Sequence, residues 1–187
     1  MRKNIFQRIA VLLVIAASVL VGAAAQHSAP ERAPDQAPDV TGIKNFLRVN
    51  EQICTGGQPS LDDLARLKDT GVKAVINLRR PEEFDAAGEA ARAKQLGLRY
   101  FLIPVDSSAP TDAEAKKFLK VMDGAKNRPA FIHCGSANRV GAFWMIRRVL
   151  VDGWTVDKAD EEATRVGLHS AVLRQFARDY IERHAKK

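Results

Sequence analysis

Three short runs of apolar, largely β-branched residues recur along the chain, and stretches with helical periodicity lie between them. The runs cover residues 72–78, 98–105 and 129–133, and residues 46–49 predict an edge strand. Strands that alternate with helices form a mostly parallel sheet with helices on both faces. The sequence therefore predicts one α/β domain with a sheet of about four strands and ligands bound beyond the strands' carboxyl ends.

Two capping boxes mark helix starts between the predicted strands. Ser60 is followed by Asp63, and Thr111 by Glu114, so each pair can satisfy the free N–H groups of a first helical turn. Apolar periodicity predicts further helices over residues 85–96, 140–151, 157–166 and 170–184.

Composition narrows the class of protein. The 187 residues are 46% hydrophobic and 27% charged, which excludes a disordered chain, a collagen-like chain and a multi-span membrane protein. The scattered His and Cys residues match neither a zinc-finger spacing nor a disulfide framework, so we expect no metal and no cofactor. The net charge of +7 favours anionic partners only in a general way. No nucleic-acid-binding motif accompanies the charge, so nucleic acid is not an expected partner.

The amino terminus has the features of an export signal. Basic residues precede an apolar run, and Ala23 to Ala25 supply a small-residue cleavage site, so residues 1–25 are predicted to be a signal peptide. Residues 26–40, with three prolines, are predicted to be a linker outside the fold, and residues 41–187 the folded domain. We expect a periplasmic or secreted protein, anchored in the membrane only if the signal is not cleaved.

A short polar turn joins the last predicted strand to a helix. The strand ends at His133, and Arg139 comes directly before the helix. The turn between them consists of Cys134, Gly135, Ser136, Ala137 and Asn138. In a strand–turn–helix unit of this kind, backbone N–H groups and the helix dipole form a binding site for an anion. We refer to residues 134–139 as the catalytic loop.

The residue types in this loop predict phosphoester hydrolysis. A cysteine at a helix amino terminus beside a cation is favoured as a thiolate, so Cys134 is the candidate nucleophile. Arg139 can offer a bidentate guanidinium to two phosphate oxygens. The predicted intermediate is a phosphocysteine. Asp106, directly after the apolar run at residues 98–105, is the candidate general acid for its formation and general base for its hydrolysis.

Three further residues are candidates for supporting roles. His133 either orients the loop or is a plain core histidine. Arg79 lies near the same sheet edge and can support anion binding, although ion pairing with the glutamates that follow is also expected. Cys54 either forms a redox-sensitive disulfide with Cys134 or is an unpaired, partly buried thiol.

Four ordered segments together resemble a known family. They are GGQPS at residues 56–60, GVKAVINLR at residues 71–79 with Glu82 or Glu83 just after, IPVD ending at Asp106, and the catalytic loop. The chain resembles the bacterial dual-specificity-like cysteine phosphatases, which include part of the beta-lactamase-hydrolase-like proteins, over most of residues 44–180.

The resemblance implies a phosphatase fold, a Cys134 nucleophile, an Arg139 phosphate clamp, Asp106 as general acid, and no metal. It implies a phosphorylated protein or small phosphoester as substrate, with tyrosine or dual specificity, and a monomer is the default expectation. The chain departs from the wider pattern in two ways: four residues instead of five separate Cys134 from Arg139, and Val140 replaces a common Ser or Thr. We expect Ser136 or Asn138 to substitute for the missing hydroxyl.

The short loop leaves two alternatives open. A rhodanese-like sulfurtransferase would carry a persulfide on Cys134, because its Cys-centred loop has a similar length. A non-catalytic module would bind a phosphorylated ligand without turnover.

Overall fold

A five-stranded sheet forms the centre of the computed structural model, which describes residue 40 and residues 42–185. The strand order is β1-β2-β5-β3-β4, and only the β1–β2 pair is antiparallel. The strands are β1 (Leu47–Asn50), β2 (Ile53–Gly56), β3 (Ala74–Asn77), β4 (Arg99–Leu102) and β5 (Ala130–His133). The predicted α/β fold with a mostly parallel sheet is confirmed.

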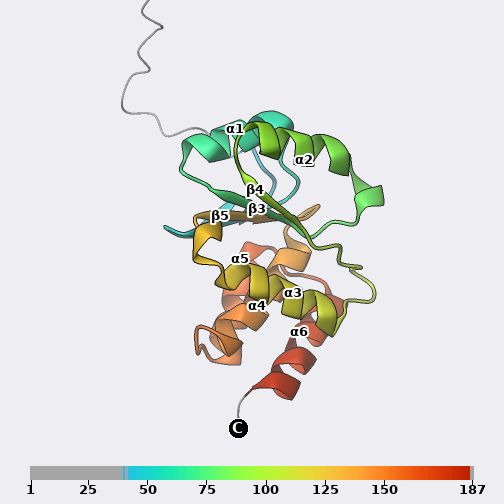
Figure 1. Ribbon diagram of the computed structural model, residues 1–187. Helices are drawn as coiled ribbons and strands as arrows, with labels where there is room; N and C mark the ends of the chain where they lie inside the picture. Colours follow the sequence, from blue (N-terminus) through green and yellow to red (C-terminus); the bar gives the residue numbers. More distant parts are fainter. Residues whose placement is uncertain (1–39, 41, 186–187) are drawn as a thin grey trace, which may run out of the picture. The chain divides into compact units, whose positions relative to one another are not determined.

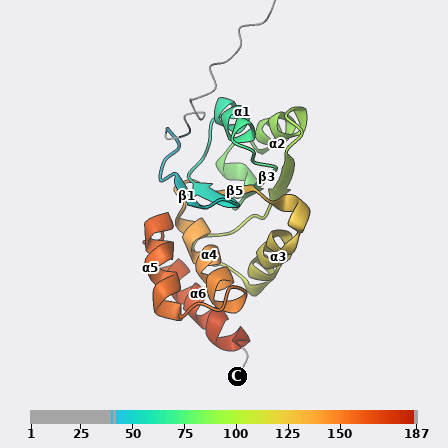
Figure 2. The same ribbon diagram turned by 90° about the vertical axis from the view of Figure 1, so that its left-hand side faces the viewer.

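Six α-helices cover the two faces of the sheet (Figure 1). Helices α1 and α2 lie on one face, and α3, α4, α5 and α6 lie on the other, as the turned view also shows (Figure 2). Their bounds are α1 (Leu61–Asp69), α2 (Ala86–Gln95), α3 (Asp112–Asp123), α4 (Asn138–Leu150), α5 (Val156–Val166) and α6 (Ala171–His184). Two short 3-10 helices, η1 (Pro81–Glu83) and η2 (Ala125–Asn127), complete the elements of the described chain.

Both predicted capping boxes are present. The Ser60 hydroxyl accepts a hydrogen bond from the Asp63 N–H at 3.1 Å at the start of α1. Thr111 and Glu114 make the reciprocal pair at the start of α3. Since each pair satisfies two otherwise free backbone N–H groups, the side chains fix where these helices begin.

Strand alternation divides the core into two clusters. Along β5, Phe131 belongs to the cluster that includes residues of α1 and α2, whereas Ile132 belongs to the cluster packed with α3 to α6. Along β3, Val75 and Ile76 divide in the same way. All four are fully buried, as expected for central parallel strands covered on both faces.

The structure differs from the sequence prediction in two places. Strand β2 was not predicted, because its sequence ICTG is short and runs directly into the glycines that predict a turn; pairing with β1 and β5 makes it a buried strand. Val40, predicted to be in the linker, is only 6% exposed and packs in the cluster with Ile43, so the folded domain includes it.

The predicted signal peptide and nearly all of the predicted linker lie outside the described residues. Within the described ranges, no helix combines the length and the apolar character that crossing a membrane requires.

Candidate active site

The catalytic loop lies between the carboxyl end of β5 and the start of α4. Cys134 follows β5 directly and is 1% exposed, packed in the core cluster on the α4 face. Ala137 is the N-cap of α4 and has φ +64°, in the left-handed region that disfavours residues with a Cβ. This conformation turns the chain sharply, so that α4 begins at Asn138 after only four residues.

The loop presents a row of free backbone donors. Among the described residues, no backbone carbonyl accepts a hydrogen bond from the N–H groups of residues 135 to 139. The first regular bond of the new helix runs from the Gly141 N–H to the Ala137 carbonyl at 2.9 Å. Consecutive N–H groups of this kind at a helix amino terminus form a concave site for an anion.

Arg139 is held by Glu83, a residue of η1. Both terminal nitrogens of the guanidinium donate to the Glu83 carboxylate at 2.7 Å, and Nη1 also donates to the Val105 carbonyl at 2.9 Å. The Arg139 side chain is 8% exposed. The hydrogen bonds from Arg139 lower the pKa of Glu83 to about 2, so Glu83 is ionised at neutral pH.

The same contacts keep Arg139 charged. Burial disfavours its charged form, but hydrogen bonds to Glu83 and the proximity of Cys134 outweigh burial and raise the pKa of Arg139. The guanidinium therefore lies next to the Cys134 sulfur as a permanent cation.

Asp106 directly follows Val105, whose carbonyl accepts a hydrogen bond from Arg139. One Asp106 carboxylate oxygen accepts from the backbone N–H and hydroxyl of Ser108, at 2.8 and 2.6 Å. The other accepts from Arg80 at 3.2 Å. The Ser108 hydrogen bonds, followed by the charge of Arg80, lower the pKa of Asp106 below its usual range.

The GGQPS segment packs against the catalytic loop. Gly57 forms a β-bridge with Ser136, and the Ser136 carbonyl accepts from the Asn45 side chain at 2.9 Å. A Cβ on Gly57 would lie 2.9 Å from the Gly135 carbonyl oxygen, too close for any side chain. Glycine at this position therefore allows the two loops to approach.

His133 belongs to a buried polar network. Its Nε2 lies 3.0 Å from the Glu89 carboxylate, and its ring stacks on Phe131. Glu89 also accepts from Gln58, and Gln58 in turn accepts from Arg79 at 2.8 Å. His133 therefore points toward α2 and ties β5 to it, a placement that fits both predicted alternatives, an orienting residue and a core histidine.

Glu89 is charged within this network. Burial alone would raise its pKa, but hydrogen bonds from His133, Gln58 and Tyr100 outweigh burial and lower it. Asn77 also donates to Glu89 at 2.9 Å. The charge of Glu89 contributes, after burial, to the raised pKa of Tyr100.

Arg79 has local partners, as its sequence context indicated. Arg79 donates to both the carboxylate and the backbone carbonyl of Glu83. Its guanidinium carbon lies over the Phe84 ring, 5.1 Å from the ring centroid. Because Arg79 contacts the same Glu83 that holds Arg139, it supports the site through Glu83.

Asn138 is engaged by the segment between α5 and α6. Its side-chain oxygen accepts from the backbone N–H groups of His169 and Ser170 at 3.0 and 3.1 Å, and its Nδ2 lies 3.3 Å from the His169 ring. These contacts direct the Asn138 amide to the segment between α5 and α6, and the expectation that Ser136 or Asn138 replaces the missing hydroxyl stays a prediction.

A disulfide between Cys54 and Cys134 does not form. Both thiols are free and buried. Cys54 pairs with Phe131 in the parallel β2–β5 register, so Cys134 lies three residues further along, about 10 Å at the usual rise per residue. A disulfide needs Cα atoms within about 7 Å, and the two side chains also pack in clusters on opposite faces of the sheet.

Sequence reasoning missed the partners of two predicted residues. Glu83 was noted only beside the strand that ends near Arg79, and its contact with Arg139 spans 56 residues of sequence. Glu89, the partner of His133, lies on the helix predicted at residues 85–96. The sequence did not indicate that this charged residue is buried.

Comparison with known proteins is consistent with this geometry. Residues 38–175 match the family model described as DSP-PTPase phosphatase fused to NAD+ kinase. The match covers most of the chain, so the protein belongs to this dual-specificity phosphatase family.

Individual relatives point the same way. The Beta-lactamase hydrolase-like protein of Agrobacterium fabrum is 30% identical over 62% of this chain, and the matched region is 27% of that protein's length. The Dual specificity protein phosphatase TpbA of Pseudomonas aeruginosa is 28% identical over 86% of this chain and 72% of its own. A crystal structure of a DUF442 protein from Shewanella putrefaciens superposes with a TM-score of 0.67, at 25% identity, over 78% of this chain and 97% of that one.

Proposed function

We propose that the protein hydrolyses phosphoesters through a phosphocysteine on Cys134, without a metal ion. The observation that carries the proposal is the row of free N–H groups at residues 135 to 139, next to both a buried thiol and a charged guanidinium. The same row of donors binds three phosphoryl oxygens and stabilises the charge that develops on them. The sulfurtransferase alternative is not favoured, since the matching family and relatives are phosphatases.

Arg139 has a second bidentate edge for the phosphate. A guanidinium has five N–H donors, and the contacts with Glu83 and Val105 use three of them. The remaining two, on Nε and Nη2, are adjacent and parallel, which suits two oxygens of a phosphoryl group. Glu83 therefore orients Arg139 and leaves the edge that the phosphate needs.

The reaction takes place in two displacements. The Cys134 sulfur attacks phosphorus, the bond to the leaving oxygen breaks, and Asp106 donates the proton that this oxygen requires. Water then attacks the phosphocysteine while the Asp106 carboxylate accepts its proton, and the sulfur–phosphorus bond breaks to release phosphate. The first displacement leaves Asp106 deprotonated and the second returns its proton, so the complete cycle restores both Asp106 and the Cys134 thiolate.

Asp106 has to gain a proton before the first step. The contacts with Ser108 and Arg80 keep it ionised in the free protein. A phosphoester dianion beside Asp106 favours the protonated form, because two like charges in one site repel. Substrate binding therefore supplies the electrostatic change that makes Asp106 an acid.

We propose a phosphorylated protein as the substrate, with tyrosine or dual specificity, because a relative that matches most of the chain carries that description. The amino-terminal sequence supports export to the periplasm or beyond, where the mature protein would act as a monomer. Fractionation of cells that express the full chain tests the location, and light scattering tests the monomer.

Hydrolysis of para-nitrophenyl phosphate by the full chain, with reductant and chelator, tests the reaction. Cys134→Ser is expected to abolish turnover, Arg139→Ala to reduce it strongly, and Asp106→Asn to lower it by about 10²- to 10⁴-fold, the usual contribution of a general acid. Cys54→Ser, which removes the other thiol, is the matched control and is expected to retain activity. Absence of phosphoester turnover together with sulfur transfer from thiosulfate to cyanide would contradict the proposal.

A further inference from the structure

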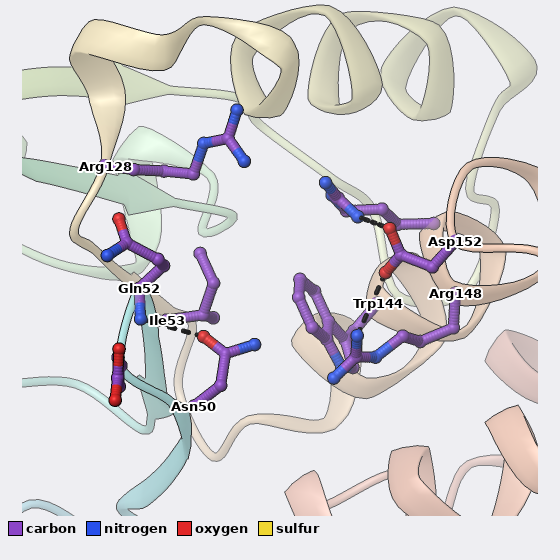
Figure 3. Close-up of a pocket in the computed structure, with 9 residues that line it drawn as sticks. Asn50, Gln52, Ile53, Arg128, Trp144, Arg148 and Asp152 are labelled. Atoms are coloured by element: carbon purple, nitrogen blue, oxygen red, sulfur yellow. Dashed lines mark hydrogen bonds and ion pairs between the residues drawn. The ribbon is translucent and has the colours of Figure 1, made fainter.

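A cavity of about 370 Å³ lies at the sheet edge opposite the catalytic loop (Figure 3). It opens where β2 and β5 begin, whereas the catalytic loop follows the end of β5. One wall comes from the approach to the two strands, with Asn50, Gln52, Ile53 and Arg128. The facing wall comes from the end of α4 and the turn after it. The volume of the cavity is in the range that small-molecule binding sites occupy.

The arginines of the α4 wall are neutralised by neighbouring carboxylates. Arg147 pairs with Asp152, and Arg148 pairs with Asp152 at 3.0 Å and with Glu162 at 2.6 Å. The indole N–H of Trp144 also donates to Glu162, at 2.7 Å. These pairs hold the wall in place and offset its charge, while the Nε of Arg147 is buried without a partner among the described residues.

The strand-side wall, in contrast, has unused donors. The Arg128 guanidinium has no hydrogen bond or ion pair to any described residue, and that includes Glu51, which lines the same cavity. The Asn50 side-chain oxygen accepts from the Gln52 N–H at 2.9 Å, so the Asn50 amide is oriented while its NH₂ group lacks an acceptor within the described chain. The Gln52 side chain likewise has no partner there.

We propose that this cavity binds a small organic anion whose carboxylate or phosphate group pairs with Arg128. A guanidinium is suited to such groups because it offers two parallel donors to two oxygens. The amides of Asn50 and Gln52 supply neutral donors beside it, and the buried Ile53 and Trp144 form the apolar part of the lining. Because Asp152 and Glu162 already pair with Arg147 and Arg148, Arg128 is the guanidinium of the lining that is left for an anion.

The cavity and the catalytic loop lie at opposite ends of the same strand, β5. Arg128 precedes β5, the catalytic loop follows it, and α4 returns the chain so that Arg148 lies across the cavity from Arg128 (Figure 3). The two sites share no lining residue, so a ligand at one leaves the other open.

The test follows the indole N–H signal of Trp144 in ¹⁵N–¹H spectra during titration with phenylphosphonate and, separately, with benzoate. Trp154→Phe assigns the two indole signals. Neither probe is hydrolysed, so the result does not depend on phosphatase activity. We expect at least one probe to shift the Trp144 signal in a saturable way, and the effective probe distinguishes a phosphate from a carboxylate ligand.

Arg128→Gln is expected to weaken that binding by about tenfold or more, the value of one lost charge-assisted contact. Arg128→Lys keeps the charge without the paired donors and is expected to give an intermediate loss. Lys126→Gln, which removes an equal charge outside the lining, is the matched control and is expected to change binding by less than about twofold. No saturable shift, or equal binding by the wild type and Arg128→Gln, would overturn the proposal; the second result would place the anion at the catalytic loop.

Discussion

The pairing of Glu83 with Arg139 predicts a measurable loss of stability in Glu83→Gln. The pKa of Glu83 falls from 4.5 to about 2 on folding, chiefly through the hydrogen bonds from Arg139. At about 1.4 kcal/mol for each pKa unit, this difference corresponds to about 3 kcal/mol at neutral pH. The value is an upper figure, because glutamine retains one acceptor oxygen for Arg139.

The sign of the pH dependence follows from the lowered pKa. A carboxylate whose pKa is depressed by folding stabilises the protein fully above its unfolded pKa, and this stabilisation is lost as the pH falls through the folded pKa. The loss for Glu83 therefore occurs between about pH 4.5 and about pH 2. The difference between wild type and Glu83→Gln should shrink from about 3 kcal/mol at pH 7 to about 2 kcal/mol near pH 3.5.

Urea unfolding at both pH values measures this difference, and Glu82→Gln is the matched control. Glu82 is the adjacent residue, its side chain is 63% exposed, and its ion pair is with Arg80 at 3.2 Å. Exposed pairs of this kind contribute about 0 to 1 kcal/mol, so the control should unfold nearly like the wild type. Equal unfolding free energies for the two variants, or a difference independent of pH, would refute the reasoning.

Three further predictions concern Asp106 and Cys54. Ser108→Ala should raise the pKa of Asp106, because the Ser108 hydroxyl is the main cause of its lowered value. The alkaline limb of the plot of kcat against pH should therefore move to higher pH. An unchanged limb would mean that another group is the acid. Burial raises the pKa of Cys54 to about 11, so in Cys134→Ser protein iodoacetamide should modify Cys54 only after unfolding, as mass spectrometry would show. The dependence of activity on reductant should be the same in Cys54→Ser as in the wild type. A difference between the two would support a disulfide between Cys54 and Cys134.

Local patterns were sufficient for the elements that surround the site. The capping boxes at Ser60 and Thr111 and the apolar runs of β3, β4 and β5 specify their structures through contacts within a few residues. The strand–turn–helix pattern placed Cys134 at a helix amino terminus for the same reason. Strand β2 escaped prediction because its four residues are a strand only when paired with β1 and β5.

The sequence by itself determined the alternation of strands and helices, the strand–turn–helix loop, and the choice of Cys134 and Arg139 as candidate residues, because these depend on periodicity and on residue chemistry. The tertiary structure alone decided the partners. It brought Glu83 to Arg139 across 56 residues, buried Glu89 against His133 across 44, and set Cys54 and Cys134 on opposite faces of the sheet. Such contacts follow from strand order and register, which pack distant segments together and leave no periodic trace in the chain.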